Sequence, residues 1–139
     1  MLLEISAMPT DLPSMILLLG RLLIGGAYLY AVIGNIRSFD KIAGFMAGRG
    51  VPRPRLVLTA GTIVHAASSL LVIAGLWTAW GAAGLIVFTI LATWMFHNFW
   101  AFEGTDRFNK RNAFSANVTI VGGLLVLLAV SLCDPTRPG

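Results

Sequence analysis

Residues 56–99 read LVLTAGTIVHAASSLLVIAGL, then WTAW, then GAAGLIVFTILATWMFHNF. Neither long run contains a Lys, Arg, Asp or Glu, and only four uncharged residues separate the two runs. A helix needs about 20 apolar residues to cross the ~30 Å hydrocarbon core of a bilayer. The pattern therefore predicts an antiparallel hairpin of two membrane-spanning helices, with Trp77 and Trp80 in an interfacial aromatic belt.

Two further apolar runs of similar length flank this hairpin. Hydrophobic residues make up 57% of the 139-residue chain and charged residues only 12%, whereas a soluble domain is about 25% charged. Backbone groups in lipid must be hydrogen-bonded within their own segment, so each run is expected to be a helix. We predict an all-α protein, a membrane-embedded four-helix bundle that forms one transmembrane domain over residues 1–139, with no soluble domain. The predicted spans are residues 15–36, 56–76, 81–99 and 113–132.

The basic residues collect on one side of this predicted membrane protein. Five lie in the connection at residues 37–55 and three at residues 107–111, whereas only Arg137 follows the last span. The positive-inside rule places the two basic connections in the cytoplasm and both termini outside it. The chain lacks the basic helix or basic-aromatic patch of nucleic-acid modules, so we expect a lipid bilayer and no nucleic acid as its surroundings.

The first connection has a pattern of its own. Apolar side chains at positions 39, 42, 43 and 46 share one helical face, and charged residues occupy the other. We predict a short amphipathic helix over residues 39–47 that lies in the cytoplasmic interface. A plain loop is the alternative.

Small residues are spread through the four spans. No hydrophobic force drives helices together in lipid, so small side chains serve to let backbones approach closely. These residues predict a compact bundle. They are Gly20, Gly25, Gly26, Gly61, Ser68, Ser69, Gly81, Gly84, Gly122 and Gly123.

Two polar residues deep inside the spans, Arg21 and His65, need an explanation. Arg21 sits about two turns below the outer end of the first span, at a cost of roughly 2.5–3.5 kcal/mol for an Arg at mid-helix. It either reaches headgroups and backbone carbonyls or anchors an anionic or carbonyl-bearing ligand. His65 lies near the middle of the second span, within one or two turns of the height of Arg21. It is either a hydrogen-bonded packing residue or a proton relay or ligand donor.

A polar and aromatic cluster is expected at the cytoplasmic end. Trp94, His97, Asn98 and Trp100 end the third span, and Asn117 lies near the start of the fourth. These side chains form either a shallow pocket for a headgroup or a set of interfacial caps and inter-helix hydrogen bonds.

Other kinds of site are not indicated. The two histidines have no thiolate or carboxylate near them in the spans, which falls short of the three ligands of a metal site. No nucleophile triad, phosphate loop or carboxylate pair appears, and the lone Cys133 excludes a dithiol.

Several segments together resemble the DoxX-like family of small four-helix membrane proteins, over about residues 15–130. The most specific of them is ATWMFHNFW at residues 92–100. The others are RLLIG at 21–25, Phe45 with GVP at 50–52, and Asn117 ahead of GGLL at 122–125.

The resemblance implies a multi-pass protein of the prokaryotic cytoplasmic (inner) membrane that is tied to redox metabolism. The family takes its name from a subunit of a thiosulfate:quinone oxidoreductase, and relatives are linked to quinone response or membrane oxidoreductase assemblies. Its members usually carry a Glu near the position of His65. A buried Arg–Glu pair therefore cannot form here, and Arg21 must be neutralised in another way or have another role.

Two functions follow as hypotheses. The first is a membrane subunit of a quinone-linked oxidoreductase that offers a quinone headgroup site. His97 would donate a hydrogen bond or proton, Asn98 and Asn117 would orient the ring, and Trp94 and Trp100 would flank it. The chain shows no electron carrier of its own, so a flavin, haem or iron–sulfur protein would be the partner.

The second hypothesis is a non-catalytic anchor or assembly subunit of a larger membrane complex. A small transporter is disfavoured, because no span is broken by proline and none contains an acid that could couple to ions.

Overall fold

The computed structural model describes residues 11–133, and this part of the chain is helical with no β-strand. Four of its helices are long and apolar enough to cross a membrane, which confirms the predicted all-α membrane fold. The elements are α1 (Leu12–Arg37), α2 (Phe39–Gly48), α3 (Pro54–Ala74), α4 (Thr78–Phe96), the short 3₁₀ helix η2 (Phe99–Ala101) and α5 (Gly104–Leu132).

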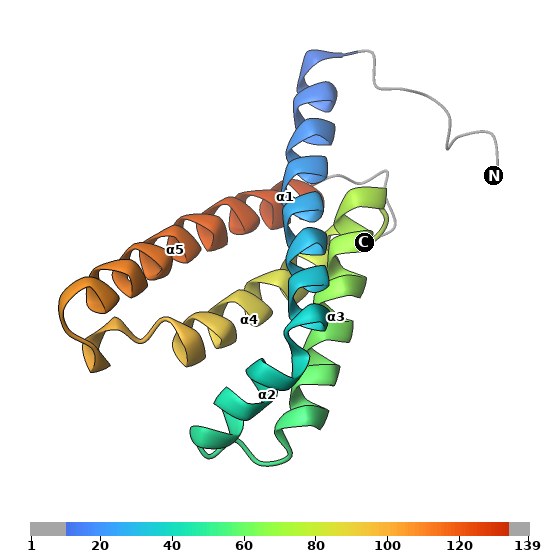
Figure 1. The fold of residues 1–139 in the computed structure, drawn as a ribbon. Coiled ribbons are helices and arrows are strands. Elements are labelled where there is room, and N and C mark those ends of the chain that lie inside the picture. Colours follow the sequence, from blue (N-terminus) through green and yellow to red (C-terminus); the bar gives the residue numbers. More distant parts are fainter. Residues whose placement is uncertain (1–10, 134–139) are drawn as a thin grey trace.

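The four long helices pack in the order α1, α3, α4, α5. Helices α1 and α3 run side by side, and α4 and α5 form a second pair inclined to the first (Figure 1). The backbones of α1 and α5 do not approach each other within residues 11–133. The bundle is therefore more open than the small residues suggested.

The hydrophobic core lies where the two pairs meet. Val72 of α3 and Leu85 of α4 are fully buried there against Leu124 of α5. Side chains of α1, among them Ile24 and Tyr28, pack onto the same cluster. All four long helices therefore contribute to one core although their backbones form an open arrangement.

The helix boundaries differ from the predicted spans in instructive ways. Helix α3 ends at Ala74 rather than at residue 76, because Gly75 adopts a left-handed conformation (φ +70°) and its N–H bonds the carbonyl of Leu71 at 3.0 Å. Helix α4 then runs over 78–96 instead of 81–99. Helix α5 begins at Gly104, nine residues before the predicted span, since hydropathy marks the apolar part of a helix and not its charged extension.

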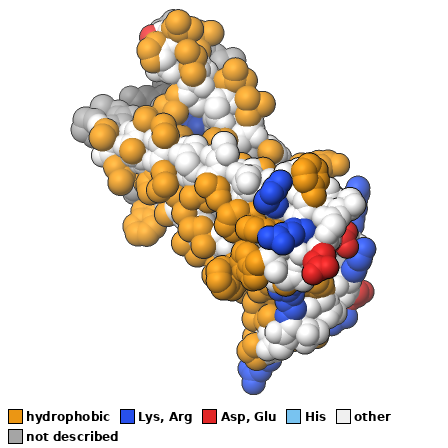
Figure 2. Space-filling model, turned by 90° about the vertical axis from the view of Figure 1, so that its left-hand side faces the viewer, with side chains coloured by type: hydrophobic (Ala, Val, Ile, Leu, Met, Phe, Trp, Pro, Cys, Tyr) orange, Lys and Arg blue, Asp and Glu red, His pale blue; other side chains and the backbone are white. Residues whose placement is uncertain are grey.

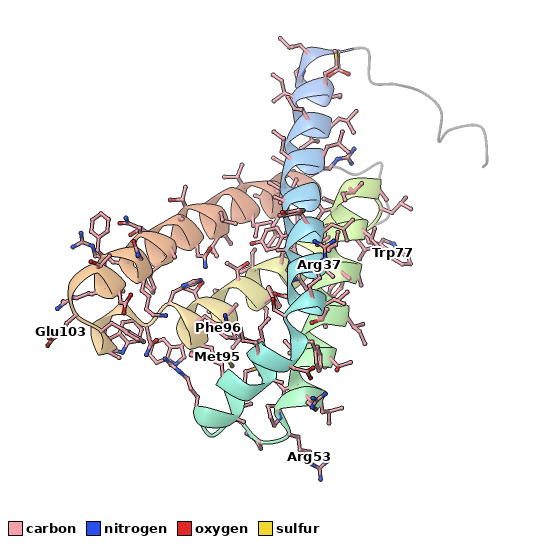
Figure 3. All side chains as sticks on the ribbon, viewed as in Figure 1. Arg37, Arg53, Trp77, Met95, Phe96 and Glu103 are labelled. Atoms are coloured by element: carbon pink, nitrogen blue, oxygen red, sulfur yellow. The ribbon has the colours of Figure 1, made fainter. Side chains whose placement is uncertain are left out.

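The amphipathic helix is confirmed as α2, and the plain loop is excluded. Its apolar face packs on protein: Ala43 and Met46 are buried against Leu58 of α3. Met95 and Phe96, at the end of α4, pack on the same cluster from the other side (Figure 3). Helix α2 therefore fills the wedge between the diverging α3 and α4 (Figure 1).

Only some of the small residues mediate close helix packing. A Cβ on Gly25 would lie 3.0 Å from the carbonyl oxygen of Ser69, and one on Gly81 would lie 2.9 Å from that of Ser68. These glycines let α3 pack closely against α1 and α4, as predicted. In contrast, a Cβ on Gly20, Gly26, Gly122 or Gly123 would meet no atom within 4 Å.

The charged side chains gather at one end of the molecule. Figure 2 shows hydrophobic side chains over most of the visible face, with Lys, Arg, Asp and Glu concentrated at one end. Arg55 forms a surface ion pair there with Asp40. Arg137 and both termini lie outside the described residues, and the direction in which the bundle crosses the membrane stays a prediction.

Candidate functional site

The chain breaks its helix at the end of α4. The N–H of His97 caps α4 by bonding the carbonyl of Thr93 at 2.9 Å, and Asn98 leads into η2. This turn brings Trp100 back over Trp94, with ring centroids 5.3 Å apart and the rings tilted by 51°. The two indoles expected from the sequence to flank a ligand therefore lie together, and His97, which lies between them in the sequence, is half-buried.

The aromatic cluster extends onto α5. Phe114 of that helix contacts Phe99 with its centroid 5.4 Å away and Trp100 at 6.4 Å, both edge to face. Trp94 is 71% exposed and Trp100 48% exposed. The cluster thus presents accessible ring surface at the end of the bundle, on a base of packed phenylalanines.

Asn117 joins the two helices of the second pair. Its Nδ2 donates a hydrogen bond of 2.8 Å to Oγ1 of Thr93, which is buried. This bond is of the inter-helix kind that the sequence left as an alternative to ligand binding. One N–H and the carbonyl oxygen of the amide remain for another partner, because a primary amide has two N–H donors.

Asn98 is tied to α2 in a similar way. Nη2 of Arg49 donates a 2.9 Å hydrogen bond to Oδ1 of Asn98. The same guanidinium lies 4.9 Å from the ring centre of Phe45, which stacks on Phe96 at 5.2 Å. The carbonyl of Asn98 is therefore occupied, while its NH₂ group carries no hydrogen bond from the described residues.

Lys110 is a second basic residue that sequence reasoning counted only as a topology signal. Its Nζ donates a 2.9 Å hydrogen bond to the carbonyl of Phe96, at the last turn of α4, and lies 4.5 Å from the ring centre of Phe102. A cation at a helix C-terminus is favourable because it meets the negative end of the helix dipole. No spacing in the sequence announces this contact, since it depends on how the chain turns after Phe96.

Arg21 is buried at the opposite end of the bundle. Its guanidinium lies against Gly75, so closely that a Cβ there would fall 1.9 Å from Nη1. Gly75 caps the C-terminus of α3, so the Arg21 charge sits at the negative end of that helix dipole. This placement matches the interpretation in which Arg21 interacts with backbone groups.

His65 lies in the middle of the bundle and is 1% exposed. It stacks on Phe88 of α4 with centroids 4.0 Å apart, and Tyr28 of α1 meets it edge to face at 5.2 Å. Neither ring nitrogen has a hydrogen-bond partner among residues 11–133. Leaving a buried polar group unpaired costs roughly 1–3 kcal/mol in proteins, so these two atoms call for an explanation.

Arg21 and His65 are further apart than the sequence suggested. The Arg21 guanidinium lies at Gly75, ten residues along α3 from His65, which corresponds to about 15 Å at 1.5 Å per residue. This separation is about three helical turns rather than the one or two turns expected from the sequence.

The structure thus divides the polar residues into three places. The first place is where α4 ends and α5 begins, with the two tryptophans, His97, Asn98 and Asn117. The second is the C-terminal end of α3, where Arg21 lies. The third is the middle of the bundle, where His65 lies. Among the described residues, no three His, Cys, Asp or Glu side chains form a group that could hold a metal ion.

Comparison with known proteins gives a consistent family. The family model described as DoxX matches residues 16–98. The chain is also similar to the protein named inner membrane protein YphA of Escherichia coli (strain K12), with 24% identity over 112 residues, which cover 81% of this chain and 80% of that protein. No solved structure matches the chain significantly.

Proposed function

The chain belongs to the DoxX family of membrane proteins, and we propose that it is a membrane subunit of a quinone-linked redox complex. The quinone headgroup would bind at the end of the bundle where α4 ends and α5 begins. The observation that carries the proposal is the exposed Trp94–Trp100 pair, with centroids 5.3 Å apart, in the turn that also contains the half-buried His97. Flat ring surface beside a polar donor suits a flat headgroup with carbonyl oxygens.

The amides support the same site. Asn117 keeps one N–H and its carbonyl oxygen after bonding Thr93. Asn98 keeps its two N–H donors after accepting from Arg49. Because these amides are already held in place by their existing bonds, they offer fixed hydrogen-bonding groups to a quinone oxygen. His97 would be the group that donates a hydrogen bond or a proton.

The proposed partner is a second protein that supplies electrons. Reduction of a quinone to a quinol takes up two electrons and two protons, and a flavin, haem or iron–sulfur protein would deliver the electrons. We place the site in the cytoplasmic leaflet of a prokaryotic inner membrane, with both termini outside the cytoplasm. The basic residues of the two connections, eight of the ten in the chain, favour this orientation.

The four tryptophans provide a direct test, because two lie at each end of the bundle. In the double variant Trp77→Phe/Trp80→Phe, the remaining tryptophans are Trp94 and Trp100, so the tryptophan fluorescence comes from the proposed site. We expect a short-chain quinone, added to this variant in lipid nanodiscs, to quench its fluorescence saturably. In Trp94→Phe/Trp100→Phe, where only the remote pair remains, quenching should rise linearly with quinone dissolved in the lipid.

The matched pair of variants separates binding from partitioning. If both variants are quenched alike, the quinone is only dissolved in the membrane and the proposed site is wrong. Adding His97→Ala to the first variant should weaken saturable quenching by about tenfold, the effect of losing roughly 1.4 kcal/mol of binding free energy.

A second candidate function is a non-catalytic anchor or assembly subunit, and the openness of the bundle favours it. The backbones of α1 and α5 do not meet, and large apolar side chains such as Ile16 and Leu23 of α1 and Val126 of α5 are exposed. Extraction of the native membrane in mild detergent discriminates the two functions. A stoichiometric partner without saturable quinone quenching would favour the anchor, and purification as a lone chain would exclude it.

A further inference from the structure

We propose that the middle of the bundle binds buried water at the two ring nitrogens of His65, with Thr62 of α3 and the hydroxyl of Tyr28 of α1 as further partners. The proposal concerns a site remote from the end of α4 and does not depend on the quinone hypothesis. It rests on three buried polar atoms without a partner in residues 11–133, namely Nδ1 and Nε2 of His65 and Oγ1 of Thr62.

These atoms lie on the same side of α3. Thr62 precedes His65 by three positions, and residues at that spacing have Cβ atoms about 5–6 Å apart on one helix face. At this separation the two side chains need not bond each other directly, and a small molecule can bridge them. Oγ1 of Thr62 is buried even though the residue as a whole is only half-buried.

The aromatic contacts determine where a ligand of His65 must lie. Phe88 stacks on one face of the imidazole, at 4.0 Å and 29° between planes, and Tyr28 meets it at 85°. Ring nitrogens form hydrogen bonds in the plane of the ring, so the stacked Phe88 leaves these directions open. The imidazole is 1% exposed, which restricts the occupant to a very small molecule.

Proton accounting identifies Tyr28 as a third partner. The hydroxyl of Thr89 donates to the carbonyl of Leu85 at 2.7 Å, and a hydroxyl has only one proton to donate. The bond between Tyr28 and Thr89 must therefore use the proton of Tyr28. The phenolic oxygen of Tyr28 keeps its capacity to accept a hydrogen bond, and the Tyr28 ring contacts His65 with centroids 5.2 Å apart.

The same accounting limits another nearby hydroxyl. Ser69 lies one turn after His65 and gives its proton to the backbone carbonyl of His65 at 2.7 Å, so it cannot donate to a second partner. A neutral imidazole has one donor and one acceptor nitrogen, Thr62 can donate or accept, and Tyr28 can accept. The two ring nitrogens point in diverging directions, so each needs its own water molecule. Thr62 and Tyr28 provide further partners for these waters, since a buried water makes two to four hydrogen bonds.

Nuclear magnetic resonance of the full chain in lipid nanodiscs tests the proposal. The chain has two histidines, so His97→Gln leaves His65 as the only ¹⁵N-labelled imidazole. We expect the His65 N–H to show a magnetisation-transfer peak from water. We also expect the unprotonated nitrogen to have the ¹⁵N shift of a hydrogen-bonded acceptor, which is observable even when the proton exchanges rapidly.

Matched threonine variants locate the site. Thr62→Val should change both ¹⁵N shifts and remove most of the water peak. Thr59→Val, one turn earlier on the exposed side of α3 with its hydroxyl bonded to the carbonyl of Arg55, should change neither. The proposal is overturned if the unprotonated nitrogen has the shift of a free imidazole, or if Thr62→Val and Thr59→Val give the same spectrum as the parent.

Discussion

At the scale of single residues, the position of the Arg21 side chain depends on the absence of a side chain at Gly75. Gly75 has φ +70°, and a Cβ there would fall 1.9 Å from Nη1 of Arg21. One glycine therefore serves two purposes, since it ends α3 and leaves room for a buried cation. The charge at the helix end contributes in turn to the stability of that end, by up to about 2 kcal/mol in partly buried cases.

Gly75→Ala is expected to destabilise the protein by about 2–4 kcal/mol. The left-handed conformation costs an alanine about 1–2 kcal/mol, and displacement of the guanidinium from the end of α3 adds to that loss. Gly50→Ala is the matched control, because Gly50 has φ +76° but a Cβ there meets nothing within 4 Å. Thermal unfolding in detergent, followed by circular dichroism, should show a clearly larger loss for Gly75→Ala, and equal losses would contradict the role given to Arg21.

A second residue-scale prediction concerns the bond between Asn117 and Thr93. A double-mutant cycle with Asn117→Ala and Thr93→Val should give a coupling energy of about 0.6 kcal/mol, and at most ~1.7 kcal/mol, as for other hydrogen bonds between membrane helices. Thr89 is the control partner, since its hydroxyl bonds Leu85 and Tyr28 instead. Additive effects of Asn117→Ala with Thr93→Val would show that the bond contributes nothing to stability.

Residues of the candidate site were predictable from sequence to different degrees. Arg21 and His65 were found because a polar residue in an apolar run needs a reason. Arg49 and Lys110 were missed, because each lies in a basic connection and acts on a group that only the folded chain presents to it. These groups are the amide oxygen of Asn98 and the carbonyl of Phe96.

At the scale of elements, hydropathy located every long helix but not its ends. Helix α5 runs from Gly104 through Arg107 and Lys110 before it becomes apolar. A helix continues as long as its backbone hydrogen bonds are favourable, whether it lies in lipid or in water. Hydropathy marks only the part of the helix that lies in lipid. The amphipathic period of α2 predicted its apolar face, but it could not show that this face packs between α3 and the end of α4 rather than in lipid.

The contact of α2 with α4 yields an element-scale prediction. Arg49→Gln removes the charged hydrogen bond to Asn98 and the contact with Phe45, worth about 1 kcal/mol for an exposed arginine. The amides in the last turn of α2 should then exchange hydrogen roughly fivefold faster, because local opening becomes easier by that amount. Arg53→Gln is the control, because the Arg53 side chain points away from the molecule (Figure 3). Equal exchange rates in the two variants would mean that the hydrogen bond between Arg49 and Asn98 does not hold the end of α2 in place.

At the scale of the whole molecule, the fold class followed from the lengths of four apolar runs, while the openness of the bundle did not. Lipid replaces the missing neighbour of an apolar helix face without cost, so hydropathy gives no signal for which helices touch beyond the hairpin of α3 and α4, which its short turn predicts. The structure supplies that order, α1–α3–α4–α5. It also places all of the charged connections at one end (Figure 2).

This charge asymmetry predicts the orientation of the molecule, and the lone cysteine can test it. Cys133 is exposed at the end of α5 away from the basic connections. If the positive-inside rule holds, a membrane-impermeant maleimide should label Cys133 in intact cells. A cysteine moved to the other end of α5, Asn109→Cys in a Cys133→Ser background, should react only after the membrane is opened; Asn109 is also exposed, so access to the side chain is matched. The reverse pattern would place the proposed quinone site on the outer side, where electrons would have to come from an extracytoplasmic partner.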